Sequence, residues 1–271
     1  MMDWHGMAIV CLAVLFIGVS KAGFGGGLGM LTTPLAVLAF GRGGHTATYA
    51  IGILLPLLCA GDAFSLWHYW GRWEKKNLKY LLPGVVAGIL AGVRLIGRFS
   101  ARELNVAIGV LALSFVVFQL VKERLTRAEG SFAPNYRLGI PCGIGAGITS
   151  TFAHGAGPVV TVFLVPQRLP KEVYVGTSVL VFTWINWLKM PFFMIDQTMV
   201  NWPVFASKAM ITPETLRMSL CLLPLVPVGV WFGVRLNRKI PEKLFLRTVY
   251  FITFLAGLEL VFDFNLARLF R

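Results

Sequence analysis

Acidic residues are scarce in this sequence, and charge of either sign is low. Only 12 of the 271 residues are Asp or Glu, and charged residues make up 14% of the chain against 56% hydrophobic ones. Soluble domains carry about a quarter charged residues, so this composition excludes an ordinary soluble protein. There are no paired carboxylates at catalytic spacing and no nucleophile beside a base, so the sequence predicts neither an enzyme nor a cofactor.

Cysteine is also rare, and basic residues form no block. The four cysteines are widely spaced within or beside apolar runs, which argues against a disulfide framework or a metal site. The formal charge of +13 is spread over short clusters between apolar runs, without a basic stripe that would indicate a nucleic-acid partner. The first residues lack Lys and Arg, so we expect the first apolar run to remain as a membrane span and not to be a cleaved signal peptide.

Apolar runs recur from one end of the chain to the other. A helix needs roughly 20 apolar residues to cross a bilayer. The predicted spans are 6–22, 27–41, 46–69, 79–97, 103–121, 138–154, 157–167, 173–195, 216–235 and 243–263. Two of them, 27–41 and 157–167, are short and follow Gly-rich breaks, which is typical of discontinuous helices in transporters. We therefore predict an all-α membrane protein with about eight to ten transmembrane segments.

An internal repeat divides the chain into two halves. The motif Leu81-Leu82-Pro83, with Gly88 and Gly92-Val93-Arg94-Leu95, returns 141 residues later as Leu222-Leu223-Pro224, with Gly229 and Gly233-Val234-Arg235-Leu236. We predict a first transmembrane repeat over 1–121, a charged cytoplasmic linker over 122–137, and a second transmembrane repeat over 138–271.

The distribution of basic residues predicts the topology. With five crossings in each half, the loops at 71–79, 122–137, 166–172 and 235–243 share one side and hold 14 Lys and Arg, against 7 on the other side. Cytoplasmic loops are the ones enriched in Lys and Arg. An odd number of crossings makes the halves inverted repeats. We expect a bacterial inner-membrane protein with both termini in the periplasm.

The first candidate site is the break that contains Lys21, Gly25, Gly26 and Gly27. A helix that restarts there exposes unpaired N–H groups and the positive end of its dipole, which together favour an anion. The alternative is a small-residue packing face with Lys21 extending to the interface.

The second candidate site is the matching break in the second half. It offers Ser150, Thr151, His154, Gly155 and Gly157, whose hydroxyls, ring nitrogens and flexible backbone suit an anion. His154 is also a candidate for carrying a proton. The alternatives are hydroxyls bonded to their own helix and a structural histidine.

Four further residues are candidates for the site. Thr177 and Ser178 open a later helix, where capping is the alternative role. Lys189 lies deep in a predicted span, and a buried cation in hydrocarbon is a functional candidate by default. Asp62, similarly placed in the first half, is either its ion-pair partner or a separate proton site.

The glycines offer a rival interpretation of the whole chain. Gly84, Gly88 and Gly92 form a small-residue face on which a membrane assembly subunit could dock a partner. An anion channel and a homodimer are further alternatives that the sequence leaves open.

The breaks resemble those of a known family. Lys21-Ala22-Gly23-Phe24-Gly25-Gly26-Gly27 with Thr33-Pro34, and Gly155-Ala156-Gly157 with Gly176-Thr177-Ser178, resemble the TauE/SafE family of sulfite and sulfonate exporters. The sequence departs from that pattern at His154, which stands where Phe24 stands in the first break. The resemblance implies transport of a small sulfur oxyanion or organosulfonate, such as sulfite, thiosulfate or sulfoacetate, through the lipid bilayer.

Overall fold

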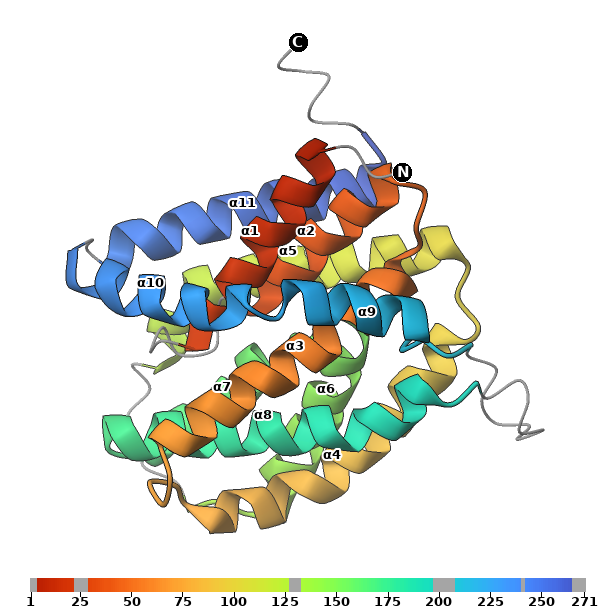
Figure 1. Ribbon diagram of the computed structural model, residues 1–271. Coiled ribbons are helices and arrows are strands. Elements are labelled where there is room, and N and C mark those ends of the chain that lie inside the picture. Colours follow the sequence, from red (N-terminus) through yellow and green to blue (C-terminus); the bar gives the residue numbers. More distant parts are fainter. Residues whose placement is uncertain (1–3, 22–28, 127–132, 197–207, 240–241, 265–271) are drawn as a thin grey trace.

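The computed structural model describes residues 4–21, 29–126, 133–196, 208–239 and 242–264. Over these residues the chain forms helices and no strand (Figure 1). The first half contains α1 (Trp4–Lys21), α2 (Gly29–Arg42), α3 (Ala47–His68), α4 (Lys75–Ile96) and α5 (Ala101–Thr126). The second half contains α6 (Tyr136–Ala153), α7 (Gly157–Leu164) with the 3₁₀ turn η1 (Val165–Gln167), α8 (Lys171–Met194), α9 (Pro213–Leu222), α10 (Leu225–Lys239) and α11 (Glu242–Phe262). The predicted all-α class is confirmed.

The helix lengths agree with a protein that crosses a membrane several times. Among the described residues α3, α4 and α5 are each long and apolar enough to span a bilayer, and α9 with α10 is a fourth candidate if the bent pair counts as one span. The two spans that were predicted to be short are short, since α2 has 14 residues and α7 has 8.

One predicted span, 216–235, is not a single straight helix. It divides into α9 and α10, whose axes differ by 41° across a break at Leu223 and Pro224. Proline lacks the N–H that would continue the helical ladder, and it disfavours helical geometry in the residue before it. The matching proline of the first repeat, Pro83, lies inside the continuous helix α4.

The glycine face of α4 is packed within the chain. A methyl group on Gly84 or Gly88 would overlap the backbone of α6 at Ile140 or Ile144, and one on Gly92 would overlap Thr151. Such close approach of two backbones is the usual role of small residues between membrane helices. The proposed docking face for a partner is therefore wrong, because α6 already covers it.

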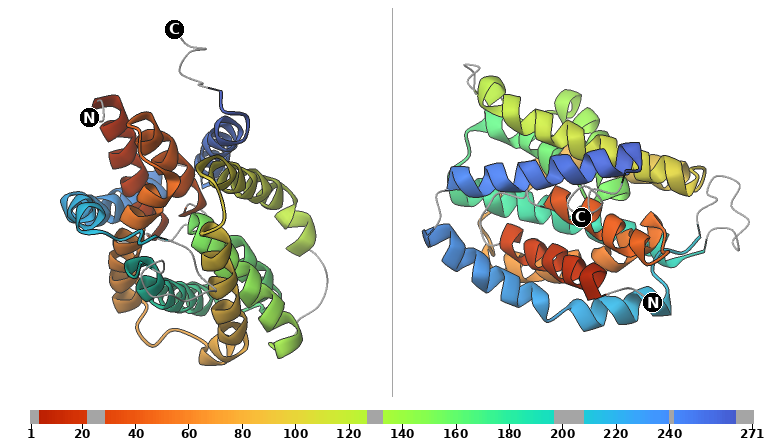
Figure 2. Two further views of the ribbon diagram at one scale, coloured as in Figure 1. Left: turned by 90° about the vertical axis from the view of Figure 1, so that its right-hand side faces the viewer. Right: turned by 90° about the horizontal axis from the view of Figure 1, so that it is seen from above.

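A corresponding glycine of the second half packs against a helix of the first half. Gly229 of α10 lies against Leu15 and Gly18 of α1. Thus α4 packs on α6, the first helix of the other half, and α10 packs on α1 (Figure 2). This exchange agrees with two related halves, while their inverted relation stays a prediction.

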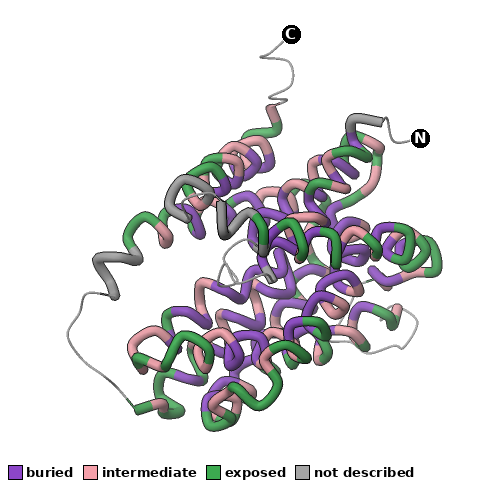
Figure 3. The backbone as a smooth tube through the Cα atoms, turned by 60° about the vertical axis from the view of Figure 1, so that its left-hand side comes forward, coloured by how far each residue is buried: buried purple, intermediate pink, exposed green. Residues whose placement is uncertain are grey.

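Both halves contribute to one core. A single cluster of buried apolar side chains includes residues from Val10 in α1 to Leu260 in α11. Figure 3 shows buried residues along the inner faces of the helices and exposed ones outside. Large apolar side chains also face outward, among them Val117 and Phe251, which are 59% and 62% exposed. Outward apolar surface on this scale suits contact with lipid.

Contacts near the two ends of α3 show which segments lie together at each end. Beyond its last residue, Arg72 forms an ion pair of 3.0 Å with Glu172 at the start of α8. At its first turn, the hydroxyl of Tyr49 donates to Glu214 of α9 at 3.1 Å. The loops at 71–79 and 166–172 therefore lie at one end, as predicted from their charge.

Candidate functional site

The site is built around the end of α6. His154 follows Ala153 in the left-handed conformation, with φ of 50°, and its N–H donates to the carbonyl of Ser150. The bond of the His154 N–H is that of an αL cap. The N–H of Gly155 donates to the carbonyl of Thr149, so two helix-end carbonyls are satisfied. Helix α7 then restarts at Gly157 with proline in its first turn, a position that suits a residue without an N–H. The predicted break of the second half is confirmed.

Lys189 of α8 reaches this break from the side. The residue is 0% exposed. Its ammonium donates to the carbonyl oxygen of Ser150 at 3.0 Å, to the Ser150 hydroxyl at 2.8 Å and to Nδ1 of His154 at 3.1 Å. An ammonium has three donors, so each of them is matched to a neutral acceptor.

The ring of His154 joins α6 to α3. Its Nε2 lies 3.1 Å from the carbonyl oxygen of Ile51. A carbonyl can only accept, so Nε2 carries the proton and donates it to Ile51. Nδ1 is then unprotonated and accepts from Lys189, which agrees with the contact at 3.1 Å. In this geometry the imidazole is neutral.

A buried carboxylate of α3 also contacts α8. Asp62 of α3 is 0% exposed, and its Oδ2 accepts a hydrogen bond of 2.7 Å from the amide of Asn186 in α8. Asp62 is also close enough to interact electrostatically with Lys189. Asn186 therefore holds the Asp62 carboxylate, and the ion pair expected between Asp62 and Lys189 stays a prediction.

The first half of the chain also reaches the break, through α2. The hydroxyl of Thr33 donates to the carbonyl of Ala153 at 2.8 Å. A side chain at Gly155 would overlap the thioether of Met30. The helix that follows the first Gly-rich break therefore covers the second one.

The structure separates the sequence-predicted residues into groups. Ser150, His154, Gly155 and Lys189 lie together, with Asp62 beside them. Lys21 has no described side chain, and Gly25, Gly26 and Gly27 lie outside the described residues. Gly157 is the first residue of α7.

Three of the predicted hydroxyls donate to backbone carbonyls of their own helices in this structure. Thr151 donates to the Gly147 carbonyl of its own helix, and Ser178 donates to that of Tyr174. Thr177 donates to Val173 and accepts from the backbone N–H of Glu74, which fastens α8 to the start of α4. The bond of Thr151 to its own helix is the alternative role considered from the sequence. The expectation that Thr177 and Ser178 open a helix is wrong, because α8 already begins at Lys171.

Sequence reasoning missed Asn186 and the carbonyl of Ile51. Asn186 stands three residues before Lys189 on one helix face, so a search for polar residues in the predicted span at helical spacing would have found it. A backbone carbonyl has no sequence signal. Thr33 was seen only as part of the family motif.

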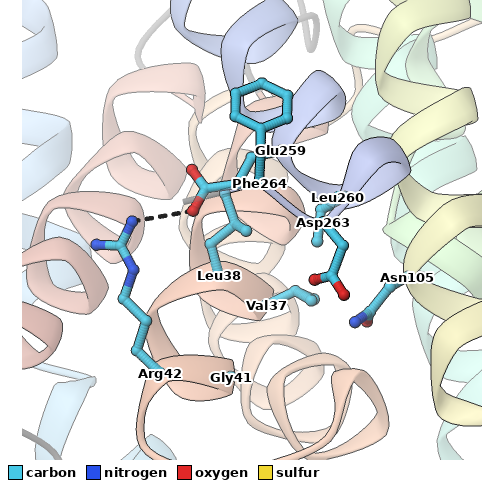
Figure 4. Close-up of a pocket in the computed structure, with 9 residues that line it drawn as sticks. All are labelled: Val37, Leu38, Gly41, Arg42, Asn105, Glu259, Leu260, Asp263 and Phe264. Carbon is cyan, nitrogen blue, oxygen red and sulfur yellow. Dashed lines mark hydrogen bonds and ion pairs between the residues drawn. The ribbon is translucent and has the colours of Figure 1, made fainter. Parts of the chain in front are cut away.

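A separate cavity of about 250 Å³ lies at the other end of α2 (Figure 4). Arg42 and Glu259 face each other across it in an ion pair of 3.1 Å. The remaining lining residues are Val37, Leu38, Gly41, Asn105, Leu260, Asp263 and Phe264. None of the predicted site residues lines this cavity, so it is distinct from the Lys189 site.

These features define a class of protein. Several apolar helices surround a helix break, and a fully buried cation points into that break. Within the residues that the structure describes, no cluster of His, Cys, Asp and Glu could hold a metal ion. The chain is a multi-pass helical membrane protein.

The family follows from comparison with known proteins. The profile of the family described as sulfite exporter TauE/SafE matches residues 10–260, and the chain belongs to this family. Searches of curated proteins and of solved structures gave no match. The suspected family is confirmed, and it suggests a membrane exporter of sulfite or another sulfur compound.

Proposed function

We propose that the chain is a secondary transporter that exports a small sulfur-containing anion, such as sulfite, thiosulfate or sulfoacetate. The anion binds between α6, α7 and α8, where it contacts Lys189, Ser150 and His154. The two halves of the chain rock against each other and expose this site to one side of the membrane at a time.

Lys189 is the observation that carries the proposal. A fully buried ammonium is costly unless it is hydrogen-bonded and compensated, and here its hydrogen-bond partners are all neutral. An oxyanion would add the attraction between opposite charges, which is strong in a buried site of low dielectric constant and which neutral acceptors do not supply. The site is therefore suited to gain free energy from an anion.

The surrounding groups fit an anion with several oxygens. Ser150 has a hydroxyl that can turn from Lys189 toward a ligand. Helix α7 begins three residues after His154, and the N–H groups of its first turn are suited to an anion. A tetrahedral or pyramidal oxyanion offers one oxygen to each of these donors.

The first test is the thermal stability of the detergent-purified protein in the presence of sulfite, thiosulfate, sulfoacetate, taurine, sulfate, phosphate and acetate. A ligand that binds only the folded protein raises its stability by mass action. We expect stabilisation by a sulfur anion and not by phosphate or acetate. Counterflow of the stabilising anion in proteoliposomes then separates a carrier from a channel, which does not show counterflow.

The matched variants are Lys189→Met and Lys171→Met, both in α8. Lys171 lies exposed at the start of the helix. K189M should remove stabilisation by the anion and counterflow, and K171M should retain both. Equal anion affinity in wild type and in folded K189M would reject the site.

We also propose the location and orientation predicted from charge. The chain lies in a bacterial inner membrane, with the end of α3 at Arg72 in the cytoplasm and both termini in the periplasm. Support comes from the first turn of α1 and the last turn of α11, which lie at the same end of the bundle (Figure 1). Such an arrangement requires an even number of crossings.

A further inference from the structure

We propose that His154 takes up one proton when the anion binds, so that proton and anion are transported together. This rests on the proposed function, because it requires the anion to bind at Lys189. The hydrogen bond between Lys189 and His154 is the contact that couples the two ligands.

All three hydrogen-bond donors of the Lys189 ammonium are already in use. Its three donors are engaged by the carbonyl of Ser150, the hydroxyl of Ser150 and Nδ1 of His154. An anion that contacts the ammonium must displace one of them. The bond to His154 is the one that a proton removes, because Nδ1 accepts from Lys189 only while it is unprotonated.

The proton also changes what His154 offers to the anion. Nε2 remains a donor to Ile51, so the ring keeps its place on α3. A proton from water forms an N–H bond at Nδ1, and the ring becomes a cation that donates from that atom. The ammonium of Lys189 turns away from this cation, and both groups then donate to the same anion.

Among the described residues, charged and titratable groups lie near Lys189 on α3 and at the end of α6. They are Asp62 and the thiol of Cys59 in α3, and His154 after α6. From α2 the break is covered by Met30 and Thr33, which do not titrate. Of these groups, His154 is the one whose protonation removes a hydrogen bond of Lys189.

Asp62 is a less suitable proton acceptor than His154. Its Oδ2 already accepts a hydrogen bond of 2.7 Å from the amide of Asn186. A proton on Asp62 would leave the contact between Lys189 and His154 unchanged. The contact between Lys189 and His154 is therefore broken by a proton on His154 and not by a proton on Asp62.

The test measures the affinity of the purified protein for methanesulfonate and for thiosulfate between pH 7 and pH 9. Both probes are fully ionised over this range, so the anions themselves carry no proton. Because binding takes up one proton, the affinity should fall by up to about tenfold for each unit of pH increase. Calorimetric titration of methanesulfonate in two buffers of different ionisation enthalpy should count about one proton taken up per anion.

H154N is the variant that isolates the proton. Asparagine tolerates the left-handed conformation of residue 154, and its side-chain oxygen can accept from Lys189 without titrating. The affinity of H154N should not depend on pH over this range. H68N, at the exposed end of α3, is the control and should keep the wild-type dependence.

Two results would overturn the inference while leaving the proposed function intact. One is binding by wild type without pH dependence or proton uptake, and the other is an unchanged pH dependence in H154N, which would assign the proton to another group. If H154N does not fold, H154Q takes its place, because its side-chain oxygen can also accept a hydrogen bond without titrating. Failure of both probes to bind would overturn the inference together with the proposed site.

Discussion

At the scale of the residue, three hydrogen bonds hold the ammonium of Lys189. Ser150 accepts from it twice, through its carbonyl and its hydroxyl. Leaving a buried donor unsatisfied costs about 1–3 kcal/mol. Each acceptor around the ammonium therefore contributes to stability as well as to the proposed anion site.

Ser150→Ala should lower the apparent free energy of unfolding by about 1–3 kcal/mol, because one ammonium donor loses its buried acceptor. It should also weaken the stabilisation by the sulfur anion. Thermal unfolding in detergent, with and without sulfite, measures both effects.

The control for this prediction is Thr149→Ala. Thr149 has its hydroxyl bonded to the Gly145 carbonyl of its own helix and belongs to the same segment. Its replacement should change stability by at most about 0.5 kcal/mol. Equal losses in the two variants would contradict the role given to Ser150.

At the scale of the element, close packing of glycine decides how α4 lies on α6. Gly84 and Gly88 bring the two backbones together, and Gly143 and Gly147 do the same from the side of α6. In lipid, such packing holds helices together without a hydrophobic driving force. The glycine face of α4, which the sequence offered as a docking surface, is thus buried against α6.

Gly88→Ala should destabilise the protein by about 1–3 kcal/mol, because the added methyl group overlaps the backbone at Ile144. Gly41→Ala is the matched control in α2, where a methyl group meets open space. It should be neutral or stabilising by up to about 1 kcal/mol. Thermal unfolding of both variants distinguishes them, and a neutral G88A would reject tight packing of α4 on α6.

At the scale of the whole molecule, the two ends of the bundle differ in charge and in contacts. The end at Arg72 joins α3 to α8, and the end at Tyr49 joins α3 to α9. Helix α3, with 22 residues, spans about 33 Å between them. This length matches the hydrocarbon thickness of a bilayer of about 30 Å.

Single cysteines at the two ends test the proposed orientation. Thr46→Cys and Lys171→Cys, each in a background without the native cysteines, place exposed thiols at opposite ends. In intact spheroplasts a membrane-impermeant maleimide should label T46C, and it should label K171C only after permeabilisation. The reverse pattern would invert the topology.

The sequence predicted the helices well, because apolar length and glycine breaks are local signals. The ends of α3, α7 and α8 fall close to the predicted spans. The kink at Pro224 was missed, since the equivalent Pro83 leaves α4 continuous. The same Leu-Leu-Pro motif lies inside a continuous helix in α4 and at a break between α9 and α10. The local sequence therefore cannot predict which of the two will form.

For the candidate site, residue chemistry was visible in the sequence and proximity was not. The sequence by itself determined a membrane-spanning helical chain, a break before Gly157 and a buried cation at Lys189, because hydropathy, backbone freedom and charge belong to single residues. Only the tertiary structure decided that Lys189 meets Ser150 and His154, that Asn186 holds Asp62, and that Thr177 fastens α4. These partners come from helices far apart in the chain, so their meeting depends on how the helices pack.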